Sequence, residues 1–254
     1  MARFDNLFKS ISLGPIRINN RIFNPPHGTS LGSHGIVSED LIAYHERRAQ
    51  GGVGLIIVEG MTLHHTYDYT HSFIYAGDDK VIPGLNALSA ACSKHNVPVI
   101  GQLFHAGRAV RASHDGSKPR VYSASAVPDE RYRIIPMEMP GDMVWEIIDA
   151  YVAAAVRIVE AGLDGVEILG GMGYLISQFL NPHTNQRQDE FGGNLKNRIR
   201  FLVEILMQTR KAIGLDRALG LRATLSEMTV NGIDTDVMLN VLRTIDQLNI
   251  VDYF

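Results

Sequence analysis

Apolar, β-branched runs alternate along the chain with segments of helical periodicity. Between these runs, apolar residues recur every three or four positions, most clearly over 145–162, where a Gly follows the last turn. Strands that are almost continuously apolar and alternate with helices indicate a parallel sheet covered on its outer face. The pattern predicts strands over 21–26, 53–61, 97–105, 165–171, 218–226 and 251–254, and further helices over 38–50, 84–95, 194–213 and 234–248.

Such a sheet is either doubly wound and open or closed into a (β/α)8 barrel. Doubly wound nucleotide-binding folds usually carry G-x-G-x-x-G after the first strand, and this sequence has no such motif there. Polar or glycine-rich residues instead follow the strand ends, and in a barrel those ends meet at one rim, where active sites lie. The barrel is therefore favoured. The strand-end groups are 26–28, 59–60, 102–108, 170–174 and Arg222.

The number of units is lower than a closed barrel needs. Six strand–helix units are predicted, the last ending within a strand at Phe254, whereas closure requires eight. Residues 1–254 are thus expected to form the N-terminal part of a single barrel, with a hairpin at about 11–20 and a long loop at 106–143. An apolar sheet edge exposed after Phe254 would favour aggregation or a homo-oligomer.

Charge and motifs exclude several classes of protein. A net charge of −3 argues against nucleic-acid and anionic-membrane partners, and no apolar run approaches the roughly 18 residues of a membrane span. The single Cys92 rules out an internal disulfide and fits a buried thiol in a reducing cytoplasm. No H-E-x-x-H spacing supports a metal site, and His64-His65 is predicted to be solvated surface. G-x-S-x-G and Walker A sequences are absent too.

Arg222 and Gln102 interrupt apolar strands. A buried arginine needs an anion or a polar acceptor, which is either a carboxylate of Glu167 or Glu227 or an electron-rich cofactor; the two interpretations are equal at this point. Gln102 offers a donor beside an acceptor, which suits a heterocycle that displays carbonyl and N–H groups. Alternatively, Gln102 only forms hydrogen bonds with loop backbone. The same alternative holds for His105, which would then be a polar structural residue beneath the 106–143 loop.

Two glycine-containing segments have either a structural role or a role in binding a ligand. Prolines stiffen the 25–28 turn and Gly28 allows backbone to approach a flat ligand, although a simple tight turn also explains them. Tyr174 lies among Gly170, Gly171 and Gly173. It is either a packing aromatic or a general acid, because a phenol with a pKa near 10 can protonate a developing carbanion or enolate.

Several motifs resemble those of the Old Yellow Enzyme superfamily of FMN-dependent barrels. They are NRIFNPPH, YHERRAQGGVGLIIVEG, GQLFHAGR and the long stretch GLDGVEILGGMGYLISQFLNPHTNQRQDEFGGNLKNRIRF, which occur in the family's order along essentially the whole chain. The chain is most similar to the long branch that contains 2,4-dienoyl-CoA reductase, 2-enoate reductases and trimethylamine dehydrogenase-like demethylases. In that branch, downstream domains carry a 4Fe–4S cluster and FAD.

The resemblance implies a cofactor, FMN, and a reductant, NAD(P)H. It places Gln102 at the pyrimidine edge of the flavin and Arg222 opposite its N1/C2=O region, which favours the cofactor interpretation of Arg222. Tyr174 would protonate a small-molecule enoyl or dienoyl substrate during reduction of its C=C bond. The other residues implied to contact FMN are Pro25, Pro26, His27 and Gly28 along the flavin, and Glu59 and Gly60 beside its ring system.

Departures from the family pattern bear on the substrate. Leu169 and Met172 stand where many ene-reductases carry a pair that grips a carbonyl oxygen, and with His105 they are expected to line the substrate pocket. Gly28 and Gly60 replace the covalent flavin cysteine and one cage aromatic of the amine dehydrogenases. Two alternatives to C=C reduction remain: oxidative N-demethylation of a small methylated amine or betaine, and an incomplete barrel that is inactive on its own.

Overall fold

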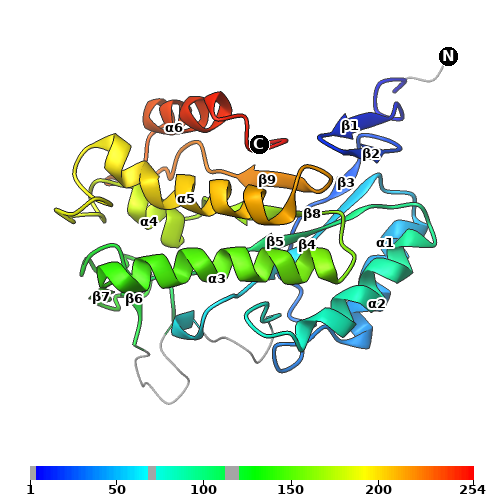
Figure 1. Ribbon diagram of the computed structural model, residues 1–254, viewed down its shortest axis with the longest axis horizontal. Coiled ribbons are helices and arrows are strands. Elements are labelled where there is room, and N and C mark those ends of the chain that lie inside the picture. Colours follow the sequence, from blue (N-terminus) through cyan, green and yellow to red (C-terminus); the bar gives the residue numbers. More distant parts are fainter. Residues whose placement is uncertain (1–3, 68–72, 112–119) are drawn as a thin grey trace.

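A five-stranded parallel sheet forms the centre of the molecule in the computed structural model, which describes residues 4–67, 73–111 and 120–254 (Figure 1). The neighbour order is β3-β4-β5-β8-β9, so each strand pairs with the next one along the predicted β/α series. The predicted sixth strand is reduced to one parallel bridge between Tyr253 and Gly220. The strands are β3 (Phe23–Asn24), β4 (Leu55–Met61), β5 (Val99–Leu103), β8 (Gly165–Leu169) and β9 (Ala218–Arg222).

Helices follow the strands and cover one face of the sheet. Helix α3 packs against α5, and α1 against α2 (Figure 1). Side-chain caps explain where three of them begin: Ser38, Asn194 and Asp234 each accept a hydrogen bond from a backbone N–H three residues later. The sequence did not predict the short α4 (Leu175–Leu180) and 3-10 turn η1 (His65–Tyr67). The predicted helices are confirmed as α1 (Glu39–Gln50), α2 (Val81–Ser93), α3 (Gly141–Glu160), α5 (Leu195–Ile213) and α6 (Thr235–Gln247).

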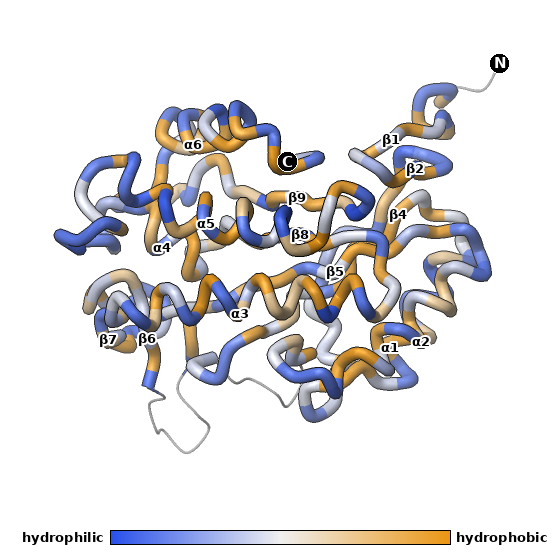
Figure 2. Tube along the Cα trace, in the orientation of Figure 1, coloured by the Kyte–Doolittle hydropathy of each residue, from blue (hydrophilic) through white to orange (hydrophobic). Residues whose placement is uncertain are grey.

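Strand residues alternate between two environments, because successive side chains of a strand point to opposite faces. In β4, Ile56 and Val58 belong to the large core beneath the helices, whereas Leu55 and Ile57 belong to a separate apolar cluster on the other face. That second cluster also contains Ile100 of β5 and Ala218 of β9. Hydrophobic positions accordingly concentrate along the strands, while the 181–194 loop is mostly hydrophilic (Figure 2).

A small hairpin covers the inner apolar cluster. Strands β1 (Ile11–Leu13) and β2 (Ile16–Ile18) pair antiparallel, within the range where the sequence predicts a hairpin. Ile16 and Ile18 pack with the inward residues of β4, β5 and β9. The amino-terminal end of the sheet's inner face is therefore closed by apolar side chains, which leaves the carboxyl end for polar ones.

The long connection between β5 and α3 contains some regular structure. Its strands β6 (Tyr122–Ser123) and β7 (Met137–Glu138) form a short parallel pair, and α3 begins at Gly141 rather than at the predicted 145. Cys92 is buried in α2, as the helical pattern predicted. Within the described residues, no helix combines the length and apolar character that crossing a bilayer requires.

Candidate functional site

The inward side chains become polar toward the carboxyl ends of the strands. Two positions after Ile57, Ile100 and Gly165, on the same face, stand Glu59, Gln102 and Glu167, all buried. Gln102 and Glu167 are register partners in β5 and β8. The strand period thus explains why these three polar side chains share one space above the apolar cluster. They are Glu59 of β4, Gln102 of β5 and Glu167 of β8.

Glu167 is the centre of this polar group. Its Oε1 accepts from Nε2 of Gln102 at 2.7 Å, and its Oε2 accepts from the Tyr253 hydroxyl at 3.0 Å. The Tyr253 ring fills the space above Gly220, where an added Cβ would lie 2.1 Å from the ring. Burial raises the pKa of Glu167, while the two hydrogen bonds and the charge of Arg222 act in the opposite direction. From the sequence, Glu167 is expected only as one of two possible ion-pair partners of Arg222.

Glu59 and Gly60 lie in an irregular part of β4. The pairing of β4 with β5 shifts between Val58 and Met61, and such a bulge re-aims side chains. Thr29 donates to Oε2 of Glu59 from both its backbone N–H, at 2.7 Å, and its hydroxyl. Oε1 of Glu59 is buried and has no hydrogen-bond partner among the described residues. Burial raises the pKa of Glu59, opposed by the Thr29 hydrogen bonds and by nearby His27.

Gly60 keeps open the space beside Gln102. A Cβ at Gly60 would lie 2.8 Å from the ring of Phe104 and 3.3 Å from Oε1 of Gln102. Since Nε2 of Gln102 is engaged with Glu167, this Oε1 is the remaining acceptor of the amide. The absence of a side chain at Gly60 therefore leaves that acceptor reachable.

Arg222 ends β9 next to Leu169, its register partner in β8. The arginine is exposed, and its guanidinium forms no hydrogen bond or ion pair within the described part of the chain. Neither ion pair considered from the sequence is formed: Glu167 binds Gln102 and Tyr253, and Glu227 accepts from Asn181 and from the Ile233 N–H. Among the residues that the structure describes, Arg222 is therefore an unpaired cation at the rim.

The 25–28 turn follows β3 at the edge of the sheet. Pro25, His27 and Gly28 are exposed, and Pro26 is half-buried. The nearest atom to a Cβ added at Gly28 would be in the Phe73 ring, at 3.9 Å, which is an ordinary contact. Local packing thus does not require glycine at position 28, and any requirement would come from a ligand.

The positions around Tyr174 are occupied by glycine for different physical reasons. A Cβ on Gly171 would lie 2.4 Å from Oγ1 of Thr224, so the segment after β9 packs directly against this backbone. Met172 and Gly173 adopt left-handed φ values of 63° and 71°. This tight turn places Tyr174 at the N-cap of α4. The glycines therefore let two strand ends approach each other as well as removing bulk.

Tyr174 is half-buried at the edge of an aromatic cluster. Its ring centroid lies 5.3 Å from that of Phe104, the same ring that borders Gly60. Its hydroxyl forms no hydrogen bond with the described residues. Burial raises the pKa of Tyr174, with Arg131 acting in the opposite direction, so the phenol stays protonated at neutral pH. A protonated phenol with a free hydroxyl has what a proton donor needs.

The three residues predicted to line a substrate pocket are not brought together. Leu169 is buried within the aromatic cluster, whereas Met172 is exposed and lines a cavity of about 430 Å³. His105 is buried with both ring nitrogens engaged, Nδ1 with the Gly107 N–H and Nε2 with Oγ1 of Thr66. The cavity lies beside the flavin-binding candidates and contains none of them. Its other lining residues include Arg108, Asp129, Arg131, Gly173, His183 and Glu227.

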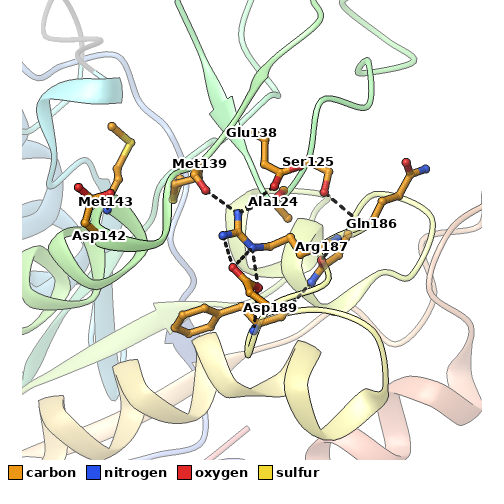
Figure 3. A network of polar contacts seen from close by, with 11 residues as sticks. Ala124, Ser125, Glu138, Met139, Asp142, Met143, Gln186, Arg187 and Asp189 are labelled. Carbon is orange, nitrogen blue, oxygen red and sulfur yellow. Dashed lines mark hydrogen bonds and ion pairs between the residues drawn. The ribbon is translucent and has the colours of Figure 1, made fainter.

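The polar 181–194 loop is held by a buried arginine (Figure 3). Arg187 donates to the backbone carbonyls of Ala124 and Met139 and forms a forked ion pair with Asp189. Asn185 donates to the carbonyls of Phe179 and Phe191, each at 2.7 Å. The Asn/Arg/Asp pattern of this loop thus connects α4 to the 122–139 segment.

One prediction about the histidines is wrong. His64 is buried rather than solvated: its Nε2 lies 3.1 Å from Oε1 of Glu146 and its Nδ1 lies 2.8 Å from Oγ1 of Thr66. The adjacent His65 is exposed, as predicted. Sequence alone gave no signal for this difference, because Glu146 lies 82 positions away along the chain.

The residues present fit a flavin. An isoalloxazine edge offers N–H and carbonyl groups, and the rim offers the free Oε1 of Gln102, the unpartnered buried Oε1 of Glu59 and the free guanidinium of Arg222. Gly60 supplies room beside the first of these acceptors. These two acceptors and one cation therefore match the N–H and carbonyl groups of FMN.

A parallel β/α series with polar residues at the carboxyl ends of its strands is the arrangement of β/α barrels that carry a site at that rim. The sequence profile of the NADH:flavin oxidoreductase / NADH oxidase family matches residues 6–250. The chain belongs to this family, and its recognition as a member of the Old Yellow Enzyme superfamily is confirmed. The (β/α)8-barrel fold class is confirmed by similarity to solved structures.

Three comparisons define the similarity further. The chain is 37% identical over 239 residues to an NADH oxidase of Thermoanaerobacter brockii, covering 91% of this chain and 36% of that protein. It is 32% identical to an N,N-dimethylglycine/sarcosine dehydrogenase of Chromohalobacter salexigens, covering 99% and 36%. A 2-naphthoyl-CoA reductase complex superposes with a TM-score of 0.89 at 28% identity, covering 98% and 40%. The chain thus spans about a third of the length of these curated relatives.

Proposed function

We propose that this chain forms the flavin-binding part of an FMN-dependent oxidoreductase that uses NAD(P)H to reduce an activated C=C bond in a small molecule. The observation that carries the proposal is the free Oε1 of Gln102, which faces the space kept open by Gly60. Family membership supports the same cofactor. When bound, FMN supplies hydride transfer between the nicotinamide and the β-carbon of the substrate.

The residues of the chain supply binding and a proton. Gln102 and Glu59 accept hydrogen bonds from the cofactor, and Arg222 places a positive charge against its electron-rich edge. His27, Gly28 and the prolines before them support its flat face. Glu167 holds the Gln102 amide in position through the 2.7 Å hydrogen bond.

Tyr174 completes the reduction by donating its phenolic proton to the substrate α-carbon, and solvent then returns a proton to the phenolate. The raised pKa of Tyr174 keeps that proton in place at neutral pH until a carbanion develops. Leu169 and Met172 provide apolar surface near it, and neither donates a hydrogen bond to a substrate carbonyl.

The test is NAD(P)H oxidation by the FMN-loaded protein with an enoyl or dienoyl thioester under anaerobic conditions. Tyr174→Phe should lower kcat about 100-fold or more, the lower range for general acid catalysis, without changing FMN affinity. Tyr44→Phe, on α1 and outside the site, is the matched control. Undiminished turnover by Tyr174→Phe would remove the tyrosine from this role, and no turnover by a parent that retains FMN would favour the incomplete barrel that is inactive on its own.

A second candidate is oxidative N-demethylation of a small zwitterionic amine. The observation in its favour is a pair of opposite charges beside Tyr174: Nη2 of Arg131 and Oε1 of Glu227 lie 3.6 and 3.9 Å from the Cβ position of Gly173, in the wall of the cavity. An amino acid betaine carries a carboxylate and a cationic nitrogen that complement this pair. One relative is named as an N,N-dimethylglycine/sarcosine dehydrogenase.

Release of formaldehyde separates the two candidates. Incubation of the FMN-loaded protein with dimethylglycine and an electron acceptor should yield formaldehyde if the second candidate holds, and Glu227→Gln should raise KM more than it lowers kcat. Absence of formaldehyde together with turnover of the enoyl substrate leaves only the first candidate.

A further inference from the structure

A second cluster of ionisable side chains lies outside the flavin-binding residues. Nε2 of His64 is 3.1 Å from Oε1 of Glu146, and one ligand atom from each of His64, His65 and Glu146 lies within 4.8 Å of the other two. The histidines follow β4 and lead into η1, while Glu146 lies in the second turn of α3. Two segments that are far apart in the sequence thus bring two imidazoles and one carboxylate close together.

The distances suit a small divalent ion. Zinc binds imidazole nitrogen and carboxylate oxygen at about 2.0–2.2 Å, so that tetrahedral ligand atoms stand roughly 3.3 Å apart. His64 and Glu146 already have this separation. The other separations must shorten, and the exposed side chains of His65 and Glu146 are free to turn inward. A fourth position would be left for water.

The buried His64 is oriented by hydrogen bonds on the Nδ1 side of its ring. Nδ1 of His105 accepts from the Gly107 N–H, so its Nε2 carries the proton and donates to Oγ1 of Thr66 at 2.9 Å. Thr66 in turn lies 2.8 Å from Nδ1 of His64, which fixes the ring with Nε2 toward Glu146. In this structure Nδ1 of His64 also accepts from the Thr66 backbone N–H at 3.3 Å, so the ring proton is on Nε2. A metal ion at Nε2 would move that proton to Nδ1, which would then donate to Oγ1 of Thr66, the outer-shell arrangement common in metal-binding histidines.

We propose that His64, His65 and Glu146 form a binding site for a divalent transition-metal ion of the zinc class. Two imidazoles with a single carboxylate select such an ion over Mg²⁺ and Ca²⁺, which need mainly oxygen ligands. The ion connects the segment after β4 to α3. Within the described residues the cluster borders the rim through His105, whose ring centroid is 6.4 Å from that of His64.

Zinc titration of the chelator-treated protein tests the site. Isothermal titration with ZnCl₂, in competition with a chromophoric chelator, should show one saturable ion per chain. His65→Ala and Glu146→Gln should each weaken it at least 10-fold, because even loss of an outer-shell partner costs about 10- to 100-fold. Thr66→Val should weaken zinc binding by about 10- to 100-fold, the range for loss of an outer-shell partner. Both ligand variants replace exposed side chains, so the fold is retained, which circular dichroism checks.

Matched controls exclude binding elsewhere. Glu160→Gln lies on the same helix as Glu146 and is exposed, and His183→Gln removes another exposed imidazole; neither should change the zinc affinity. Co²⁺ substitution should add visible absorption bands that both ligand variants lose. Equal zinc affinity in the parent and in either ligand variant overturns the site, as does the absence of saturable binding. None of these measurements depends on flavin or turnover.

Discussion

The side-chain amide of Gln102 donates to Oε1 of Glu167 across two neighbouring strands at 2.7 Å. This hydrogen bond fixes which end of the amide faces the open space beside Gly60, because the nitrogen is used and the oxygen is left. The buried carboxylate of Glu167 therefore orients the amide of Gln102 so that its oxygen is available as an acceptor at the rim.

Replacing Gln102 by Leu should affect both stability and cofactor binding. Glu167 would lose one donor while remaining buried, which lowers the free energy of unfolding by about 1–3 kcal/mol. FMN would lose an acceptor and bind more weakly. Urea unfolding and quenching of flavin fluorescence measure the two effects. Gln247→Leu, exposed at the end of α6, should change neither; undiminished FMN affinity in Gln102→Leu would contradict the proposed contact.

Gly60→Ala should weaken FMN binding about tenfold or more. The new methyl group would lie 2.8 Å from the Phe104 ring and 3.3 Å from Oε1 of Gln102, so it occupies the space that the acceptor faces. Gly141→Ala is a matched control, since no atom lies within 4 Å of its Cβ position at the start of α3. Equal flavin affinities in the two variants would show that this space is not used.

Stability should fall in mild acid because of His45. Burial, followed by the charge of Arg48, lowers the pKa of His45 to about 4, and neither ring nitrogen has a hydrogen-bond partner in the described structure. Between pH 6.5 and 4 the unfolded chain binds a proton that the folded chain does not. The stabilisation is thus complete above pH 6.5 and is lost as the pH falls, by about 3 kcal/mol at most.

His45→Leu should flatten this pH dependence without abolishing it. Buried His105, whose pKa is lowered to about 3, contributes over the same range. Denaturant unfolding at pH 7.5, 6 and 5 measures the change, and His183→Gln, an exposed histidine, should follow the parent. Parallel curves for the parent and His45→Leu would show that the pKa of His45 is the same in the folded and the unfolded chain.

Arg187→Lys should destabilise the attachment of the 181–194 loop to the 122–139 segment. A lysine cannot reproduce the simultaneous donation to Ala124, Met139 and Asp189, and the lost hydrogen bonds at about 1 kcal/mol each total roughly 2 kcal/mol or more. Arg200→Lys changes only a partly exposed pair with Glu190 and should cost less than about 1 kcal/mol. Thermal unfolding of both variants makes the comparison. A similar loss in both would mean that the buried carbonyl contacts add no stability.

Polar interruptions of apolar strands were the informative signal in the sequence. They identified Gln102 and Arg222, and the alternation of side chains explains why both face inward. The same signal occurs at Glu167 in GVEIL, but the sequence alone gave no reason to prefer a hydrogen-bond network over an ion pair. The family motifs supplied the implied roles of the 25–28 turn, which the described structure neither requires nor excludes.

Contacts between segments that are distant in the chain could not be predicted from the sequence. Tyr253 reaches Glu167 from 86 positions away and Thr29 reaches Glu59 from 30, and no local pattern announces either contact. A distant contact also determines where the ring of His105 lies. His105 follows β5 closely enough to suggest a rim position, yet its ring turns into the protein toward Thr66.

The alternation of side chains along β5, β8, β9 and the regular part of β4 (Leu55–Val58) means that the ligand-facing residues and the core residues beneath the helices occupy alternate positions of the same strands. Removal of one residue between Leu55 and Glu59 would turn the carboxylate toward the helices and bring a valine to the ligand side. Insertions and deletions are therefore excluded from these strands and confined to the connections. Homologues of this chain can diversify in loop length, whereas within the strands they can change only by substitution.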